Sequence, residues 1–122
     1  MSEPIHWTDD PAVWKGEFEG HGHGSAVSII FAWLEPGKPG PKLHTHPYSE
    51  TFVVRRGHAA FIAGDQRIEA TAGDIVVVPP DTPHAFANAG ATVLEMMDIH
   101  ASEQIVTIWL QSRSAPPALF SL

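Results

Sequence analysis

The chain contains no cysteine among its 122 residues. Disulfide bonds and thiolate metal sites are therefore excluded, so any metal ion must be held by imidazole or carboxylate groups. Cationic side chains are also few: seven lysines and arginines stand against 14 aspartates and glutamates, which gives a formal net charge of −7. Such a chain has no cationic face to neutralise phosphates, and we expect it not to bind nucleic acid.

Long apolar runs are missing as well. No apolar stretch approaches the length needed to cross a bilayer, and the amino terminus lacks a basic region followed by an apolar run. The sequence therefore predicts a cytoplasmic protein with no membrane partner. With 122 residues, 43% of them hydrophobic, the chain is long enough for one core and too short for two, so we expect a single domain over residues 1–122.

Short stretches rich in β-branched and aromatic residues recur between turn signals. They predict strands near residues 15–19, 25–35, 50–56, 59–63, 67–70, 74–78, 85–88, 92–100 and 103–110. No gap between them is long enough for a crossover helix, so the strands should pair in antiparallel fashion. The pattern indicates an all-β sandwich or barrel.

Three residues with metal-binding side chains, His44, His46 and Glu50, lie close together within residues 40–57. They share even parity, and in an extended chain residues of one parity point to one side. The step through residues 47–49 can bring Glu50 back under the two imidazoles. We therefore expect the three side chains on one face of adjoining strand segments, with donors suited to a divalent ion of Fe, Mn, Co, Ni or Zn.

A second stretch, residues 73–88, supplies a fourth candidate ligand, His84. Together the two stretches resemble the halves of the cupin signature, Gly-x5-His-x-His-x3-Glu-x6-Gly followed by Gly-x5-Pro-x-Gly-x2-His-x3-Asn. Two positions depart from it: Lys38 stands where the first glycine is expected, and Asp81 replaces a glycine of the second half. Aspartate tolerates a left-handed turn better than most residues with a side chain, so this corner should still form.

The resemblance to small single-domain cupins implies a double-stranded β-helix, or jelly-roll barrel. It also implies one divalent transition metal ion, held by His44, His46, Glu50 and His84. Cupins include dioxygenases, decarboxylases, isomerases and epimerases as well as sensing and storage proteins, so the fold alone does not choose an activity. We expect a metal-dependent, dioxygenase-like oxidoreductase that acts on a small oxygen-donor substrate. The alternatives are a metal-containing ligand-binding or sensing module without turnover, and a cupin isomerase.

Strand parity also predicts the wall of the site. If Glu50 faces inward, Phe52 and Val54 should do so too, and Phe86 should share a face with His84. With Tyr48 at the mouth, the predicted substrate pocket consists of Tyr48, Phe52, Val54 and Phe86.

Tyr48 and His100 are the candidate catalytic residues. Tyr48 could present its hydroxyl to the site, although an aromatic residue at a cavity rim is often structural. For residues 92–100 the sequence does not decide which face looks inward. If the even face does, Asp98 or His100 could support the ligands or carry a proton; otherwise His100 is a surface residue at a strand end.

The stretch 25–35 is apolar on both parities. One face can line a barrel, while the other needs a partner. An exposed strip formed by Ile30 and Leu34 would favour association between chains, so we expect a homodimer.

Overall fold

The computed structural model describes residues 3–110, and this part of the chain contains ten strands and no helix. The strands are β1 (Gly16–Phe18), β2 (Ser28–Leu34), β3 (His44–Thr45), β4 (Glu50–Arg56), β5 (His58–Ala63), β6 (Gln66–Thr71), β7 (Ile75–Val78), β8 (His84–Asn88), β9 (Leu94–His100) and β10 (Ile108–Trp109). Within the described range no helix is long and apolar enough to span a membrane.

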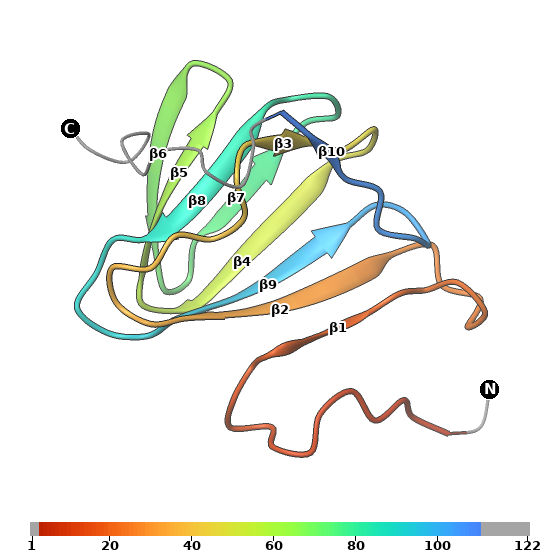
Figure 1. Ribbon diagram of the computed structural model, residues 1–122. Coiled ribbons are helices and arrows are strands. Elements are labelled where there is room, and N and C mark those ends of the chain that lie inside the picture. Colours follow the sequence, from red (N-terminus) through yellow and green to blue (C-terminus); the bar gives the residue numbers. More distant parts are fainter. Residues whose placement is uncertain (1–2, 111–122) are drawn as a thin grey trace.

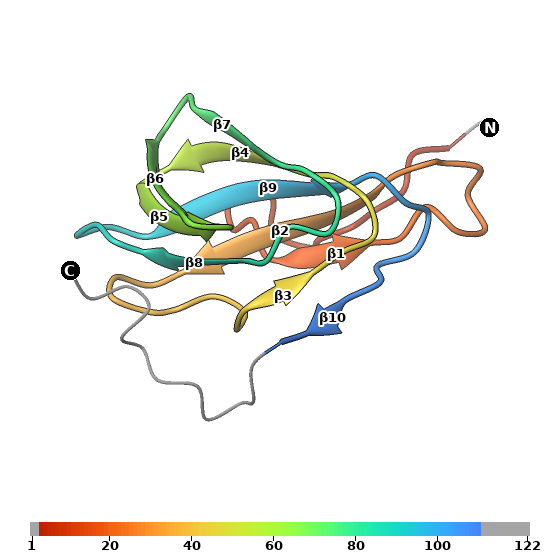
Figure 2. The same ribbon diagram turned by 90° about the horizontal axis from the view of Figure 1, so that it is seen from above.

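The strands form two antiparallel five-stranded sheets, as Figure 1 shows. One sheet has the order β1-β2-β9-β4-β7, and the other has the order β10-β3-β8-β5-β6. Figure 2, a view from above, shows that the two sheets face each other. The prediction of an all-β fold with two antiparallel sheets is confirmed.

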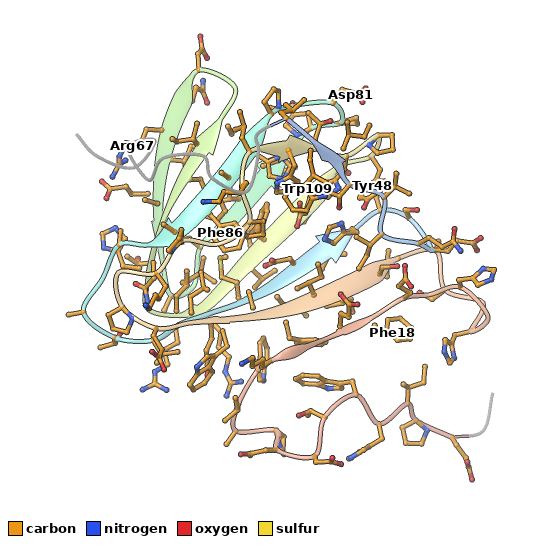
Figure 3. The ribbon with its side chains drawn as sticks, in the orientation of Figure 1. Phe18, Tyr48, Arg67, Asp81, Phe86 and Trp109 are labelled. Atoms are coloured by element: carbon orange, nitrogen blue, oxygen red, sulfur yellow. The ribbon has the colours of Figure 1, made fainter. Side chains whose placement is uncertain are left out.

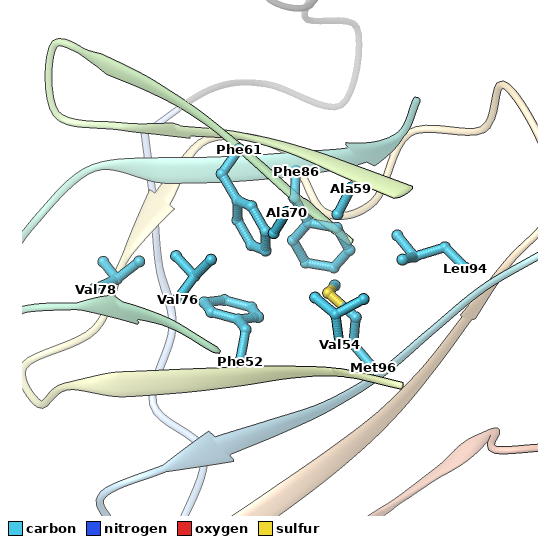
Figure 4. Close-up of a cluster of buried hydrophobic side chains, with 10 residues drawn as sticks. All are labelled: Phe52, Val54, Ala59, Phe61, Ala70, Val76, Val78, Phe86, Leu94 and Met96. Atoms are coloured by element: carbon cyan, nitrogen blue, oxygen red, sulfur yellow. The ribbon is translucent and has the colours of Figure 1, made fainter. Parts of the chain in front are cut away.

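The apolar core lies between the sheets, and Figure 4 shows its side chains converging from both. At its centre Phe52 of β4 meets Phe61 of β5 and Phe86 of β8, with ring centroids 4.9 and 5.7 Å from that of Phe52. Burial alternates along the first five residues of β4, as its parity predicts, with Glu50, Phe52 and Val54 buried and the residues between them partly exposed. Since both sheets contribute large side chains, the core fixes the spacing between them.

Most strands lie where the pattern predicts them, and the clearest exception is the stretch 103–110, which is a strand only at β10. The chain has to cross here from the first sheet, where β9 ends, to the second, where β10 pairs with β3. Its backbone groups therefore bond to loops and side chains: Ile105 N–H donates to Glu19 Oε2, and Val106 N–H donates to Tyr48 Oη.

The corner before β8 forms with aspartate in place of glycine. Asp81 has a φ of 61°, and it is the one non-glycine residue with positive φ among residues 3–110. Its N–H donates to the carbonyl of His46 over 2.8 Å. The expected left-handed turn is confirmed, and this bond ties the segment that carries His84 to the segment that carries His46.

Strand β2 does not expose the strip that we expected. Ile30 lines a cavity on the inner face of the strand, and Leu34 packs against the core. On the opposite face of the strand, Phe31 is covered by the N-terminal segment of the same chain, with Trp7 stacked on it at 3.6 Å between ring centroids and Trp14 edge-on at 5.6 Å. The homodimer stays a prediction, without β2 as its support.

Gly57 connects β4 to β5, and two constraints favour glycine at this position. Gly57 has a φ of 92°, and a Cβ atom there would lie 2.6 Å from the carbonyl oxygen of Val93. Replacement by alanine should lower the free energy of unfolding by about 2–3 kcal/mol, because it adds a steric clash to the conformational strain. Urea unfolding at unchanged m-value measures this loss.

Gly22→Ala is the matched control. Gly22 also has a positive φ, of 82°, but nothing lies within 4 Å of the position of its Cβ. Its replacement should therefore cost only the strain, about 1 kcal/mol. Equal losses in the two variants would show that the approach of Val93 has no energetic weight.

Candidate metal centre

Four side chains converge at one end of the barrel: His44, His46, Glu50 and His84. Each offers a ligand atom within 4.8 Å of the others, and all four residues are buried. Both His44 and His84 belong to the second sheet, where they are direct partners across β3 and β8. Glu50 belongs to the first sheet, at the start of β4.

The set therefore assembles between the sheets, and the expectation of one face of adjoining strand segments is wrong. The physical reason is the length of β3, which ends after two residues at Thr45. The chain then bends through residues 46–49 and enters the opposite sheet at Glu50. This bend turns the carboxylate to face the imidazoles.

Backbone carbonyls orient the three imidazole rings. Nδ1–H of His44 donates to the carbonyl of Lys42 over 2.6 Å, that of His46 to Val106 over 2.7 Å, and that of His84 to Thr82 over 2.8 Å. A carbonyl oxygen can only accept, so the proton of each neutral ring lies on Nδ1. The lone pair of each Nε2 is then free to face the centre, which is the usual state of a metal-bound histidine.

The electrostatics of the cluster call for a positive charge at its centre. Nε2 of His46 lies 3.1 Å and Nε2 of His84 lies 3.0 Å from Oε1 of Glu50, so lone pairs face a carboxylate. Nε2 of His46 is also buried without a hydrogen-bond partner. Either added protons or a cation must offset this repulsion. Three imidazole nitrogens and one carboxylate oxygen are donors that divalent transition metals accept, so the residues fit such an ion.

Burial and mutual contact shift the pKa values of the cluster. Burial lowers the pKa of His44 to about 4, which keeps this ring neutral near pH 7. Burial also opposes the charged form of His46, but Glu50 and the carbonyl of Val106 outweigh it and raise its pKa. For Glu50, burial favours the neutral acid, yet His100, His46 and His84 together hold its pKa well below its usual range. The histidines thus favour the anionic form of Glu50, and Glu50 in turn favours the protonated form of His46.

His100 joins the cluster from β9. The even face of this strand looks inward, and His100 is 1% exposed, so of the two alternatives left open the surface position at a strand end is wrong. Its Nε2 lies 3.0 Å from Oε2 of Glu50, while Oε1 of Glu50 faces the other histidines. The cause is the pairing of β4 with β9, which makes Glu50 and His100 direct partners. Spacing along the chain carries no signal of this pairing.

Tyr48 contacts two histidines of the cluster, His46 and His100. Its ring stacks on that of His46 with centroids 5.1 Å apart, and its hydroxyl lies 2.8 Å from Nδ1 of His100. The hydroxyl also accepts the N–H of Val106 over 3.0 Å. Burial raises the pKa of Tyr48, so the phenol is neutral. Figure 3 shows Tyr48 at the same end of the barrel as Trp109 of β10.

A cavity of about 450 Å³ opens from the cluster toward β2. Its walls are mainly apolar. The polar residues that line it include His44, His46, Glu50, Asp98 and His100. Other lining residues are Lys15, Glu17, Ile30 and Phe86. Of the predicted pocket residues, Phe86 lines this cavity, whereas Phe52 and Val54 belong to the core cluster and are 0% and 1% exposed.

Comparison with solved structures finds the same fold in oxalate decarboxylases. The enzyme of Bacillus subtilis, described with Mn(II) centres, superposes with a TM-score of 0.71 at 20% sequence identity, over 78% of this chain and 27% of that chain. The enzyme of Lactobacillus farciminis, solved as a formate complex, gives a TM-score of 0.69 at 22% identity, over 77% and 30% of the two chains. This chain thus spans less than a third of these enzymes, and the likeness shows the fold alone.

No curated protein sequence matches the chain significantly. The family model described as the cupin domain matches residues 31–100, which contain the four converging side chains and both signature stretches. That match covers more than half of the 122 residues. The chain belongs to the cupin family.

Proposed function

We propose that the protein is a metal-dependent enzyme, a dioxygenase-like oxidoreductase that acts on a small substrate through its oxygen atoms. The observation that carries the proposal is the convergence of three Nε2 lone pairs and one carboxylate oxygen at the inner end of an open cavity. His44, His46, Glu50 and His84 would hold the ion. A divalent ion held there would supply Lewis acidity and could accept exogenous oxygen ligands beside the four protein donors.

The surrounding residues keep the four donors in place. The carbonyls of Lys42, Val106 and Thr82 fix the rings through Nδ1. His100 faces one oxygen of Glu50, which leaves the other oxygen for the ion. Such outer partners typically change metal affinity or activity by about 10- to 100-fold when they are removed.

Tyr48 and His100 are the proposed residues for proton movement. The Tyr48 hydroxyl, His100 and Oε2 of Glu50 follow one another at 2.8 and 3.0 Å. A proton released near Glu50 can therefore move to Nε2 of His100, and the hydroxyl of Tyr48 contacts the other ring nitrogen, Nδ1, and orients the ring. The apolar side chains of Phe86 and Ile30 line the cavity beside His100 and Glu50, and such apolar surroundings strengthen polar contacts.

Elemental analysis and oxygen uptake test the proposed function. Protein purified without chelator or a metal-affinity column should contain about one divalent transition metal ion per chain. With catechols, enediols, flavonols and β-diketones, at least one class should consume O₂ in proportion to metal content. Ligands that bind and return unchanged under air would indicate a binding module instead. Carbon dioxide released from oxalate without net O₂ uptake would indicate decarboxylation.

Removal of one ligand tests the site itself. His84→Ala should weaken metal binding by about 100-fold or more, because one imidazole donor is lost and Glu50 faces a gap. Competition against a chromophoric chelator measures the affinity, and circular dichroism checks the fold. His58→Ala is the control, since His58 pairs with Glu69 at the surface, outside the cluster. Equal affinity in the two variants would rule out His84 as a ligand.

The affinity for metal should also depend on pH. Binding requires neutral imidazoles, and His46 has a pKa raised above its ordinary value of 6.5. Below that raised pKa, the association constant should fall by about tenfold per pH unit, as one proton is displaced per ion. Above it, the constant should level off. Titrations from pH 5.5 to 8.5 in a non-coordinating buffer measure the slope, and an affinity independent of pH would contradict the assignment of His46.

A further inference from the structure

Asp98 is a polar group in the cavity that the metal cluster does not use. It lies on the inward face of β9, two residues before His100, and lines the cavity together with Ile30 and Phe86. The residue is 3% exposed, and its Oδ1 atom is buried without a hydrogen-bond partner. Its partners across the sheet are Phe52 and Ile30, and neither side chain can accept or donate a hydrogen bond.

Nothing in the packing requires a carboxyl group at this position. The residues before it on the same face, Leu94 and Met96, are apolar and fully buried. A buried polar group without a partner destabilises a fold, so a leucine or valine would serve the core better. An unpartnered group that faces a cavity is instead suited to a hydrogen bond with a bound molecule.

The surroundings of Asp98 favour its neutral form. Burial, and secondly the charge of Glu50, raise its pKa well above the ordinary value of 3.8. As a neutral acid it offers one O–H donor together with an acceptor oxygen. It can therefore pair with a hydroxyl or a carbonyl group of a ligand without adding a second negative charge beside Glu50.

We propose that Asp98 is a substrate-binding residue, which hydrogen-bonds a hydroxyl or carbonyl oxygen of an uncharged substrate whose other end occupies the metal site. The inference rests on the proposed function. Two residues of β-strand span about 7 Å, so the two ends of the substrate are separated by a few carbon atoms beyond the chelating pair.

The charges around the cavity favour an uncharged substrate over a dicarboxylate. Among the described residues that line it, Lys15 is the one cation, and it lies beside β1. Glu17 and the anionic Glu50 line the same cavity. Polyhydroxylated ketones and aldehydes of three to four carbons combine a chelating oxygen pair with a further hydroxyl group.

Three hydroxyketones that differ in reach test this assignment on the manganese-loaded full chain. Hydroxyacetone offers only the chelating pair, dihydroxyacetone adds a hydroxyl on the third carbon, and erythrulose adds one on the fourth. At least one of the longer compounds should bind about five- to tenfold more tightly than hydroxyacetone to the wild-type protein, because it gains one buried hydrogen bond. Water-proton relaxation of the bound Mn²⁺, under nitrogen, measures each dissociation constant.

Two variants identify the group that is responsible. Asp98→Asn keeps a donor and an acceptor and should retain the gain. Asp98→Ala should reduce the gain to less than twofold, while its affinity for hydroxyacetone stays within twofold of wild type. A merely structural role for Asp98 would change all three affinities together.

The outcomes separate this inference from the proposed function. If hydroxyacetone binds the wild-type protein but the longer compounds gain nothing, or gain equally in Asp98→Ala, the role of Asp98 is overturned and the metal site stands. If none of the three compounds changes the relaxation of the bound Mn²⁺ in the wild-type protein, the exogenous positions are closed. The proposed function then fails, and the role of Asp98 fails with it.

Discussion

The carboxylate of Glu50 is the point at which the two sheets meet through polar contacts. It begins β4 in the first sheet, and its oxygens face His46 and His84 on one side and His100 on the other, all at about 3 Å. A buried carboxylate is unfavourable unless charge or hydrogen bonds compensate it. The imidazoles supply that compensation only if protons or a cation are present. The geometry of this end of the barrel therefore depends on what positive charge the histidines and Glu50 share.

The interior of the barrel has one apolar, close-packed part and one polar, partly open part. Around Phe52, Phe61 and Leu94 the interior is close-packed and apolar, so it fixes the distance between the sheets whatever the metal content. Around Glu50 the interior is polar, partly open and held by hydrogen bonds to loop carbonyls. The apolar part supplies the hydrophobic stabilisation of the fold. The polar part around Glu50 can therefore hold electrostatically unfavourable contacts without unfolding the barrel.

Much of this could be predicted from the sequence because the signals are local. Turn residues and stretches rich in β-branched and aromatic residues predicted β2, β4 and most other strands, and motif spacing predicted that His44, His46, Glu50 and His84 would come together. What could not be predicted depends on pairing between distant strands. His100 meets Glu50 only through the register of β9 against β4, and the opposed placement of His44 and Glu50 follows from the early end of β3. The parity of β4 correctly predicted that Phe52 and Val54 face inward. It could not show that the cavity extends toward β2 and does not include these two residues.

The segment between β9 and β10 has a consequence for how such a protein can diverge. Val106 accepts Nδ1–H of His46 through its carbonyl and donates its N–H to Tyr48, although it belongs to neither sheet. Only its backbone makes these bonds, so its side chain is free to vary. A change in the length or course of this connection would rotate an imidazole and alter its basicity while every donor atom stayed in place. Insertions in this connection can therefore change the reactivity of the site while the ligand motif stays unaltered.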